Sequence, residues 1–356
     1  MWDKAIFVWI LGGLALATVV IFPKEFRLAL TSRNLAIAAC GAALGALPLI
    51  VYNVRNDCAT FRENTVLSSA GIGQKAEALR RTLDGSGLFG YLVNDDWVEP
   101  HKNPSTRLEG TLVGLQDRVG KVRANLIPWA LVVSAAAFPL WRRRWRAMLF
   151  PLIASVAAWL QMAFTKDAGG SVHHAALLYP LPVWMIAVAA AGLADGPRWR
   201  KWLTGAAIAL LCCASLRVTN QYFTQFVRYG AAPVWSDANT RLMYTPLPPV
   251  DILIMDWGVM NSLEMFHRGQ LRIWNGVDPV AHDAQTENDR AMIRHMLELP
   301  SPVFIGHTPQ YEVNRGASER LERTAAKMGY ARQVLQTVSD SNGRTVFEIY
   351  RFAYNR

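Results

Sequence analysis

Long apolar runs alternate with short polar links over the first two-thirds of the chain. A helix that spans a bilayer needs ~20 mostly apolar residues, and about 17 at the short end. Five runs meet or approach that length, and the sixth needs flanking residues such as Trp202 to reach across. The pattern predicts an α-helical integral membrane protein with about six transmembrane helices, at residues 5–22, 35–52, 126–141, 147–164, 176–194 and 203–216.

Basic residues in the links predict how these helices are oriented. Link 142–146 carries four arginines, link 195–201 carries three basic residues, and link 23–34 carries three more. Short cytoplasmic loops are enriched in Lys and Arg. We therefore expect all three links to face the cytoplasm, and residues 53–125, 165–175 and everything after about 217 to lie outside.

From about residue 250 the pattern changes to that of a soluble α/β domain. The runs "VDILIMDWG" and "SPVFIGHT" are typical of buried strands, whereas "NDRAMIRHMLELP" and "GASERLERTAAKMGY" have helical spacing. The final stretch alternates about Asn342-Gly343, a dipeptide that favours a tight hairpin turn. The sequence predicts a C-terminal extracytoplasmic α/β domain of strand, helix, strand, helix and hairpin.

Residues 53–125 form a long predicted external loop with a pattern of its own. The segments "SAGIGQKAEALRRTLDG" and "RLEGTLVGLQDRVGKVRANL" have apolar residues at helical spacing. These two helices would either lie on the membrane surface or belong to an external cap. The expected division of the chain is residues 1–52 with two membrane helices, 53–125 as the external loop, 126–216 with four membrane helices, 217–249 as an external linker, and 250–356 as the α/β domain.

Composition and charge narrow the class of function. Hydrophobic residues make up 52% of the chain and charged residues only 18%, which disfavours an ordinary soluble protein. A formal charge of +10 could indicate nucleic-acid binding, but the basic residues lie in the links and form no stripe interleaved with aromatic residues. The four cysteines form no CxxC pair. We expect a membrane as partner and no nucleic acid.

Polar and cationic residues at the expected outer ends of the second and fifth runs are the main binding candidates. They are Tyr52, Asn53, Arg55, Arg62, Lys166, His173, His174 and Tyr179. External cations oppose the charge bias that orients the helices, and binding a lipid phosphate would explain them, because Arg offers a planar fork and Lys a point charge. In the alternative interpretation, these cations extend to lipid headgroups or pair with Asp57, Glu63 and Asp167.

The adjacent histidines leave three interpretations open. A metal site needs three or four ligands, and neighbouring residues on a helix point about 100° apart, so His173 and His174 would rarely share one ion. Contact with a phosphate or another hydrogen-bonding group, and helix capping, are the other interpretations. The sequence predicts no cofactor; a divalent metal ion is left open, although no residue of this chain supports one.

The α/β domain offers a second, smaller set of candidates. Asp256, Glu264, His267 and His307 are its titratable residues in suggestive positions. Asp256 follows a buried strand, where α/β domains place functional side chains, but such an aspartate also commonly caps the next helix. The chain contains no G-x-S-x-G and no HExxH, and no glycine-rich phosphate loop precedes the helices expected in the α/β domain. Catalytic residues are therefore not assigned.

Three stretches resemble a known family. "LGALPLIVYNVRNDCATFREN", "GGSVHHAALLYPLPVWMIAVAAAGL" and the "DWG" tail are similar to the carboxy-terminal half of bacterial membrane glycosyltransferases of the dolichyl-phosphate-mannose protein mannosyltransferase and aminoarabinose-transferase-like class. The resemblance implies a multi-span protein of the bacterial inner membrane. It also implies a polyprenyl-phosphate sugar as donor and transfer to an acceptor on the outer face.

The resemblance also predicts what this chain lacks. The family's first external loop supplies an acidic general base, but "MWDKAIFVWILGG" resembles an internal span that follows that loop. We therefore expect an N-terminal half or a partner subunit to supply the base, while this chain contacts the donor phosphate. The alternative is a non-catalytic, membrane-anchored binding or scaffold protein with an external recognition domain. A transporter is less favoured because the spans contain almost no charge.

Overall fold

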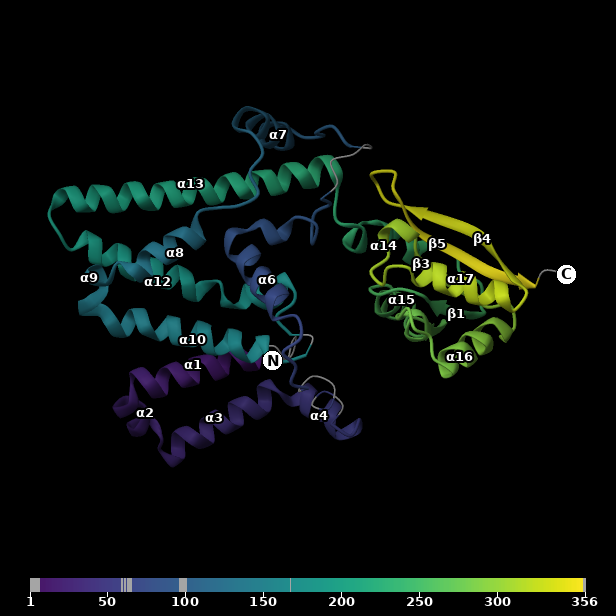
Figure 1. Ribbon diagram of the computed structural model, residues 1–356, viewed down its shortest axis with the longest axis horizontal. Coiled ribbons are helices and arrows are strands. Elements are labelled where there is room, and N and C mark those ends of the chain that lie inside the picture. The colour runs from purple at the N-terminus through teal and green to yellow at the C-terminus, as the bar shows by residue number, and fades with distance from the viewer. Residues whose placement is uncertain are drawn as a thin grey trace. The chain divides into compact units, whose positions relative to one another are not determined.

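The computed structural model describes residues 7–354 apart from 59, 61, 63–65, 96–100 and 167. The chain forms two compact units, which are described separately (Figure 1). The helical unit comprises residues 1–89 and 112–222, and the α/β unit comprises residues 90–111 and 223–356. Two helices, α7 (Arg107–Val119) and α13 (Arg198–Tyr229), contain residues of both units.

The remaining elements of the helical unit are all helices. They are α1 (Phe7–Ile21), α2 (Pro23–Ala29), α3 (Ser32–Gly45), α4 (Leu47–Arg55), α6 (Ile72–Asp84), α8 (Ile127–Ala136), α9 (Phe138–Trp141), α10 (Trp145–Ala163), α11 (Val172–Ala175) and α12 (Pro180–Ala194), with short 3₁₀ turns at Ser86–Leu88, Arg142–Arg144 and Ala176–Leu178. The predicted amphipathic helices of the 53–125 loop are present as α6 and α7.

Three described helices are long and apolar enough to cross a membrane: Phe138–Ala163, Val172–Ala194 and Arg198–Tyr229. Two bent pairs raise the number to five if each pair forms one span. The bend between α1 and α2 is 112°, and that between α3 and α4 is 65°. The prediction of about six spans is therefore not confirmed.

Prolines explain why two predicted spans, 35–52 and 126–141, are interrupted. Pro23, Pro48 and Pro139 each stand at the start of a new helical segment. Proline has no backbone N–H and cannot donate to the carbonyl four residues earlier. The run 126–141 is consequently divided, and its first part, α8, has 10 residues. At 1.5 Å per residue, α8 is about 15 Å long, half of the ~30 Å hydrocarbon core.

Ion pairs bring the three basic links to one end of the helical unit. Arg144 pairs with Asp195, and Arg146 lies 3.7 Å from Glu25. Such exposed pairs add little stability. They nevertheless show that links 23–34, 142–146 and 195–201 are neighbours, as the alternating topology of the sequence requires.

Small residues allow α1 and α10 to pack closely. Ala17 on α1 and Ala158 on α10 are completely buried. A side chain on Gly13 would collide with the carbonyl oxygen of Ala154. Small residues at such positions let helix backbones approach in lipid. The other face of α10 packs on α12, with Met148 against Met185. Thus α10 is the central helix of the unit.

The α/β unit contains a five-stranded sheet of order β2-β1-β3-β5-β4. Strands β1, β2 and β3 are parallel, and β5 runs antiparallel to both β3 and β4. The strands are β1 (Asp251–Ile254), β2 (Arg272–Asn275), β3 (Val303–His307), β4 (Tyr330–Ser339) and β5 (Thr345–Tyr354), and the helices are α14 (Ala238–Tyr244), α15 (Met260–Phe266), α16 (Glu287–Glu298) and α17 (Ala317–Lys327), with 3₁₀ turns at Pro233–Trp235, Asp278–Val280 and Pro309–Tyr311.

Helices cover both faces of this sheet. Ile252 and Ile254 of β1 belong to a core with α14 and α15, whereas Leu253 belongs to a core with α16 and α17. Side chains alternate between the faces of a strand, so β1 serves both cores. The predicted strands, helices and hairpin are confirmed. Strand β2 was not predicted, because its four residues are largely exposed and carry no apolar run.

Replacing Gly13 by alanine tests the packing of α1 on α10. We expect Gly13→Ala to destabilise the protein by about 1–3 kcal/mol, because the added methyl group meets a backbone carbonyl that cannot move aside freely. Gly41→Ala is the matched control, since no atom lies within 4 Å of a Cβ at this helical glycine. Unfolding in a mild detergent, followed by circular dichroism, measures both. Equal stability of the two variants would contradict the close packing.

Candidate functional site

The candidate residues that follow the second apolar run lie at the end of α4. Tyr52, Arg55 and Arg62 are exposed, whereas Asn53 is buried. The Asn53 side chain accepts a hydrogen bond from the Thr60 amide at 3.1 Å and donates to the Leu49 carbonyl at 2.8 Å. Asn53 therefore holds the turn after α4, and the three exposed side chains remain available to a ligand.

A backbone bridge joins the segment after Arg62 to the connector after α10. The Lys166 amide donates to the Val66 carbonyl at 2.8 Å, and the Ser68 amide donates to the Phe164 carbonyl at 2.9 Å. The side chain of Lys166 is exposed. Two segments about 100 residues apart in sequence are thus side by side. Of the carboxylates considered as partners for these cations, Asp57 is exposed, and Glu63 and Asp167 lie outside the described residues.

The two histidines contact the connector itself. His174 accepts a hydrogen bond at Nδ1 from the Gly169 amide at 3.1 Å, and His173 Nδ1 lies 2.8 Å from the Ser171 hydroxyl. Their rings meet with centroids 4.2 Å apart, and Tyr179 follows, half-buried, before α12. Within the described ranges, no three His, Cys, Asp or Glu side chains are grouped closely enough to hold a metal ion.

A buried lysine fixes this end of the helical unit. Lys75 of α6 donates to the carbonyl oxygens of Ala163 at 2.9 Å and Thr165 at 2.7 Å, and Met162 accepts at 3.4 Å. The last carbonyls of a helix have no partner within it, and a cation there also complements the helix dipole. Sequence reasoning missed this residue. Its signal was a charged side chain at helical spacing with Ala78, Leu79 and Thr82 in the 72–84 segment.

In the α/β unit, Asp256 connects two loops at the end of the parallel strands. Its carboxylate lies 2.8 Å from His307 Nδ1 and accepts from the amides of Trp257 at 2.8 Å and Val313 at 2.8 Å. Asn314 donates to the same carboxylate from its amide and its side chain, each at 3.2 Å. Helix α15 has no side-chain cap. One interpretation of the sequence expected Asp256 to cap the next helix. Instead, its side chain joins the β1–α15 loop to residues 313–314.

The electrostatics of this buried pair keep Asp256 charged. Burial raises the pKa of the Asp256 carboxyl, but the hydrogen bonds from His307, Val313 and Trp257 outweigh it, and the pKa lies below the ordinary value of 3.8. His307 is 1% exposed, and its Nε2 has no partner among the described residues. Neither Glu264 nor His267 lines the cavity that Asp256 borders.

Two cavities open within the α/β unit. The smaller, of about 320 Å³, is bordered by Asp256, Trp257 and Asn314 at the carboxyl ends of the parallel strands. The larger, of about 600 Å³, is bordered by Lys102, Trp235 and residues of the β4–β5 turn. Ligands of open α/β sheets commonly bind outside the carboxyl ends of the strands.

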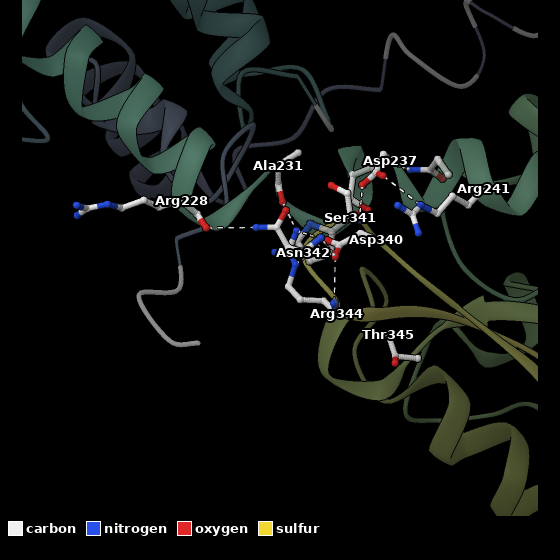
Figure 2. A network of polar contacts seen from close by, with 12 residues as sticks. Arg228, Ala231, Asp237, Arg241, Asp340, Ser341, Asn342, Arg344 and Thr345 are labelled. Atoms are coloured by element: carbon white, nitrogen blue, oxygen red, sulfur yellow. Dashed lines mark hydrogen bonds and ion pairs between the residues drawn. The ribbon is translucent and has the colours of Figure 1, made fainter. Parts of the chain in front are cut away.

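A polar network holds the β4–β5 turn against residues 228–241 (Figure 2). Arg344 pairs with Asp340 at 2.5 Å and donates to the Ala231 carbonyl at 2.7 Å. Asn342 donates to the Arg228 carbonyl at 3.3 Å, and Asp237 accepts from the Ser341 amide at 2.8 Å. Of this network, Ala231, Asp237, Asp340, Ser341 and Asn342 form one wall of the larger cavity.

Comparison with known proteins identified no relative. No family model, no curated protein and no solved structure matches the chain. The resemblance to membrane glycosyltransferases therefore stays a hypothesis, and the residues themselves must support any function.

Replacing the buried carboxylate tests its role in the α/β unit. We expect Asp256→Asn to lower the free energy of unfolding by about 1–3 kcal/mol at neutral pH, because its amide cannot accept all the hydrogen bonds that the carboxylate accepts. The folded-state pKa of Asp256 is depressed, so the stability that its carboxylate contributes is present above the unfolded-state pKa. That contribution is lost as the pH falls through the folded-state pKa.

Unfolding of the full chain in detergent from pH 7 to pH 3 measures this dependence. The stability difference between wild type and Asp256→Asn should shrink as the pH falls below about 4. A difference that stays constant over this range would rule out the depressed pKa.

Proposed function

We propose that the protein is part of a bacterial inner-membrane glycosyltransferase and binds the phosphate of a polyprenyl-phosphate sugar. The proposed phosphate site is the end of the helical unit that carries Arg62 and Lys166, with Arg55 at the end of α4. The observation that carries the proposal is the backbone bridge between residues 66–68 and 164–166. The bridge joins the segment that follows Arg62 to the segment that ends at Lys166, and both cations are exposed.

The length of α10 supports a site at the membrane surface. This helix has 19 residues, so its ends are about 28 Å apart, close to the ~30 Å hydrocarbon core. The arginine-rich turn at Arg142–Arg144 precedes it, and Lys166 follows it. In the proposed orientation, the three basic links face the cytoplasm. Lys166 then lies at the outer surface, at the depth of a carrier-lipid phosphate.

The exposed cations have the chemistry that such a donor requires. In an inverting transfer, the acceptor oxygen forms a bond to the anomeric carbon while the carrier phosphate leaves with the electron pair of the broken bond. A base takes the acceptor proton, and no residue of this chain is assigned to that role. Arg and Lys stabilise the charge of the departing phosphate, most strongly where water is excluded. His173 and His174 border the same connector and could contact the donor's hydroxyl groups once it is bound.

Polyprenyl-phosphate binding tests the phosphate site directly. We expect Arg62→Ala and Lys166→Ala each to weaken binding to the purified full chain by about tenfold or more, because a hydrogen bond to a charged group contributes ~1.5–3 kcal/mol. Arg142→Ala is the matched control, since Arg142 is also exposed but precedes α10, at the end opposite Lys166. Titration in detergent, with the uncharged polyprenol as a second control ligand, measures the affinity.

Two results would count against this proposal. If the polyprenol binds as tightly as its phosphate, the site recognises the lipid chain alone. If both variants bind like wild type, the cations have no role in donor binding, and the non-catalytic anchoring protein becomes the better interpretation.

A native cysteine tests the orientation. Cys58 follows α4 and is exposed, whereas Cys40, Cys212 and Cys213 lie within apolar helices. With these three replaced by serine, we expect a membrane-impermeant maleimide to label Cys58 in right-side-out vesicles. In a Cys58→Ser background, Arg142→Cys should react only in inside-out vesicles. The reverse labelling pattern would invert the proposed topology and remove the lipid-phosphate site from the outer surface.

A further inference from the structure

The two cavities of the α/β unit meet at a pair of tryptophans. Trp235 borders the larger cavity and Trp257 borders the smaller one. Their rings make an edge-to-face contact with centroids 5.8 Å apart, and Tyr91 packs on Trp235 with centroids 6.2 Å apart. Both cavity volumes, about 600 and 320 Å³, fall in the ~300–1,000 Å³ range of small-molecule sites. The two cavities therefore lie on either side of this aromatic contact, and together they are called here the tryptophan groove.

The tryptophan side chains are available to a ligand. Trp235 is 45% exposed and Trp257 is 54% exposed. Each therefore presents part of a large apolar ring system to solvent. A tryptophan that faces a wet cavity presents an apolar ring and one N–H donor, which suits ligands with both apolar and polar faces. Sugar rings have this character, since C–H groups form their faces and hydroxyl groups form their rims.

Around the tryptophans, the groove presents hydrogen-bonding side chains. Asn103, Ser236 and Thr240 border the larger cavity. The exposed Asn261, Asn275 and Asp278 border the smaller one. Amide and hydroxyl groups both donate and accept, and a carboxylate accepts. This mixture matches a ligand with many hydroxyl groups.

The charges of the groove favour a neutral ligand. Asp340 is paired with Arg344 at 2.5 Å, and Asp237 is paired with Arg241 at 3.2 Å. These paired carboxylates keep acceptor capacity, and Lys102 and Glu109, which also border the larger cavity, add one charge of each sign. A phosphate or nucleotide would face Asp256 and Asp278, and the smaller cavity has no cation among its described lining residues.

The walls of the groove are held in place before any ligand arrives. The network of Figure 2 fixes the β4–β5 turn, and Asp256 fixes the loop that carries Trp257 through a hydrogen bond from the Trp257 amide at 2.8 Å. Binding is more favourable when side chains and loops need not be ordered at that moment.

We propose that the tryptophan groove binds a neutral oligosaccharide, with sugar rings on Trp235 and Trp257. Glycan binding by this groove does not depend on the lipid-phosphate site. Its role as the acceptor site of a glycosyl transfer rests on the proposed function.

Binding of defined oligosaccharides to the full chain in detergent tests the groove. The probes are neutral hexasaccharides of glucose, mannose and N-acetylglucosamine, with a hexaarginine peptide and a hexameric polyphosphate as charged comparisons. We expect at least one hexasaccharide to bind, and Trp235→Ala and Trp257→Ala each to weaken that binding about tenfold or more. Isothermal titration calorimetry measures the affinities.

Trp274→Ala is the matched control, because Trp274 lies in the same unit, is also 54% exposed and borders neither cavity. It should bind like wild type. Asn261→Ala removes an exposed groove side chain without disturbing the core and should also weaken binding. Circular dichroism confirms that each variant is folded.

The proposal fails if none of the three hexasaccharides binds, if a charged probe binds more tightly than every hexasaccharide, or if Trp274→Ala weakens binding as much as the groove variants. Polyprenyl-phosphate binding is measured on the same protein. Loss of only one of the two activities therefore shows which proposal has failed.

Discussion

The carbonyl groups at the end of α10 need hydrogen-bond donors, and much of the helical unit is arranged to supply them. Lys75 of α6 donates to the carbonyls of Met162 and Ala163 in α10 and of Thr165 just beyond it, and the Ser68 amide donates to that of Phe164. A buried lysine is costly unless its charge and its N–H groups find partners, so α6 is fixed in one position on α10. This contact determines where the connector 165–175 runs and which segment lies beside it.

In the α/β unit, a buried negative charge has a comparable role to that of Lys75. The carboxylate of Asp256 gathers amides from two loops and the ring of His307 at the end of the parallel strands. In each unit, a buried charge, Lys75 or Asp256, holds backbone groups from separate segments together. Each charge also lies beside a surface proposed to bind ligand, namely the cationic end of the helical unit and the tryptophan groove.

These two surfaces differ in the ligands they suit. Exposed Arg62 and Lys166 suit an anion at a membrane surface, whereas the groove of Trp235 and Trp257 suits a neutral molecule rich in hydroxyl groups. A transferase that takes its sugar from a lipid phosphate and delivers it to a glycan needs both kinds of site. The two proposals are independent in their physical basis but compatible in chemistry.

The sequence alone determined the apolar helices, the grouping of the three basic links, and every strand except β2. Burial requires apolar residues at regular spacing, and the basic residues are concentrated in the links, so both patterns can be read from the sequence. Pro48 and Pro139 were also visible in the sequence, but the 65° bend between α3 and α4 was seen only in the folded chain. Only the tertiary structure decided that Lys75 caps α10, that Asp256 joins two loops, and that Trp235 meets Trp257. Each of these contacts joins residues that become neighbours only after the chain has folded. The local spacing of apolar and polar residues does not predict such contacts.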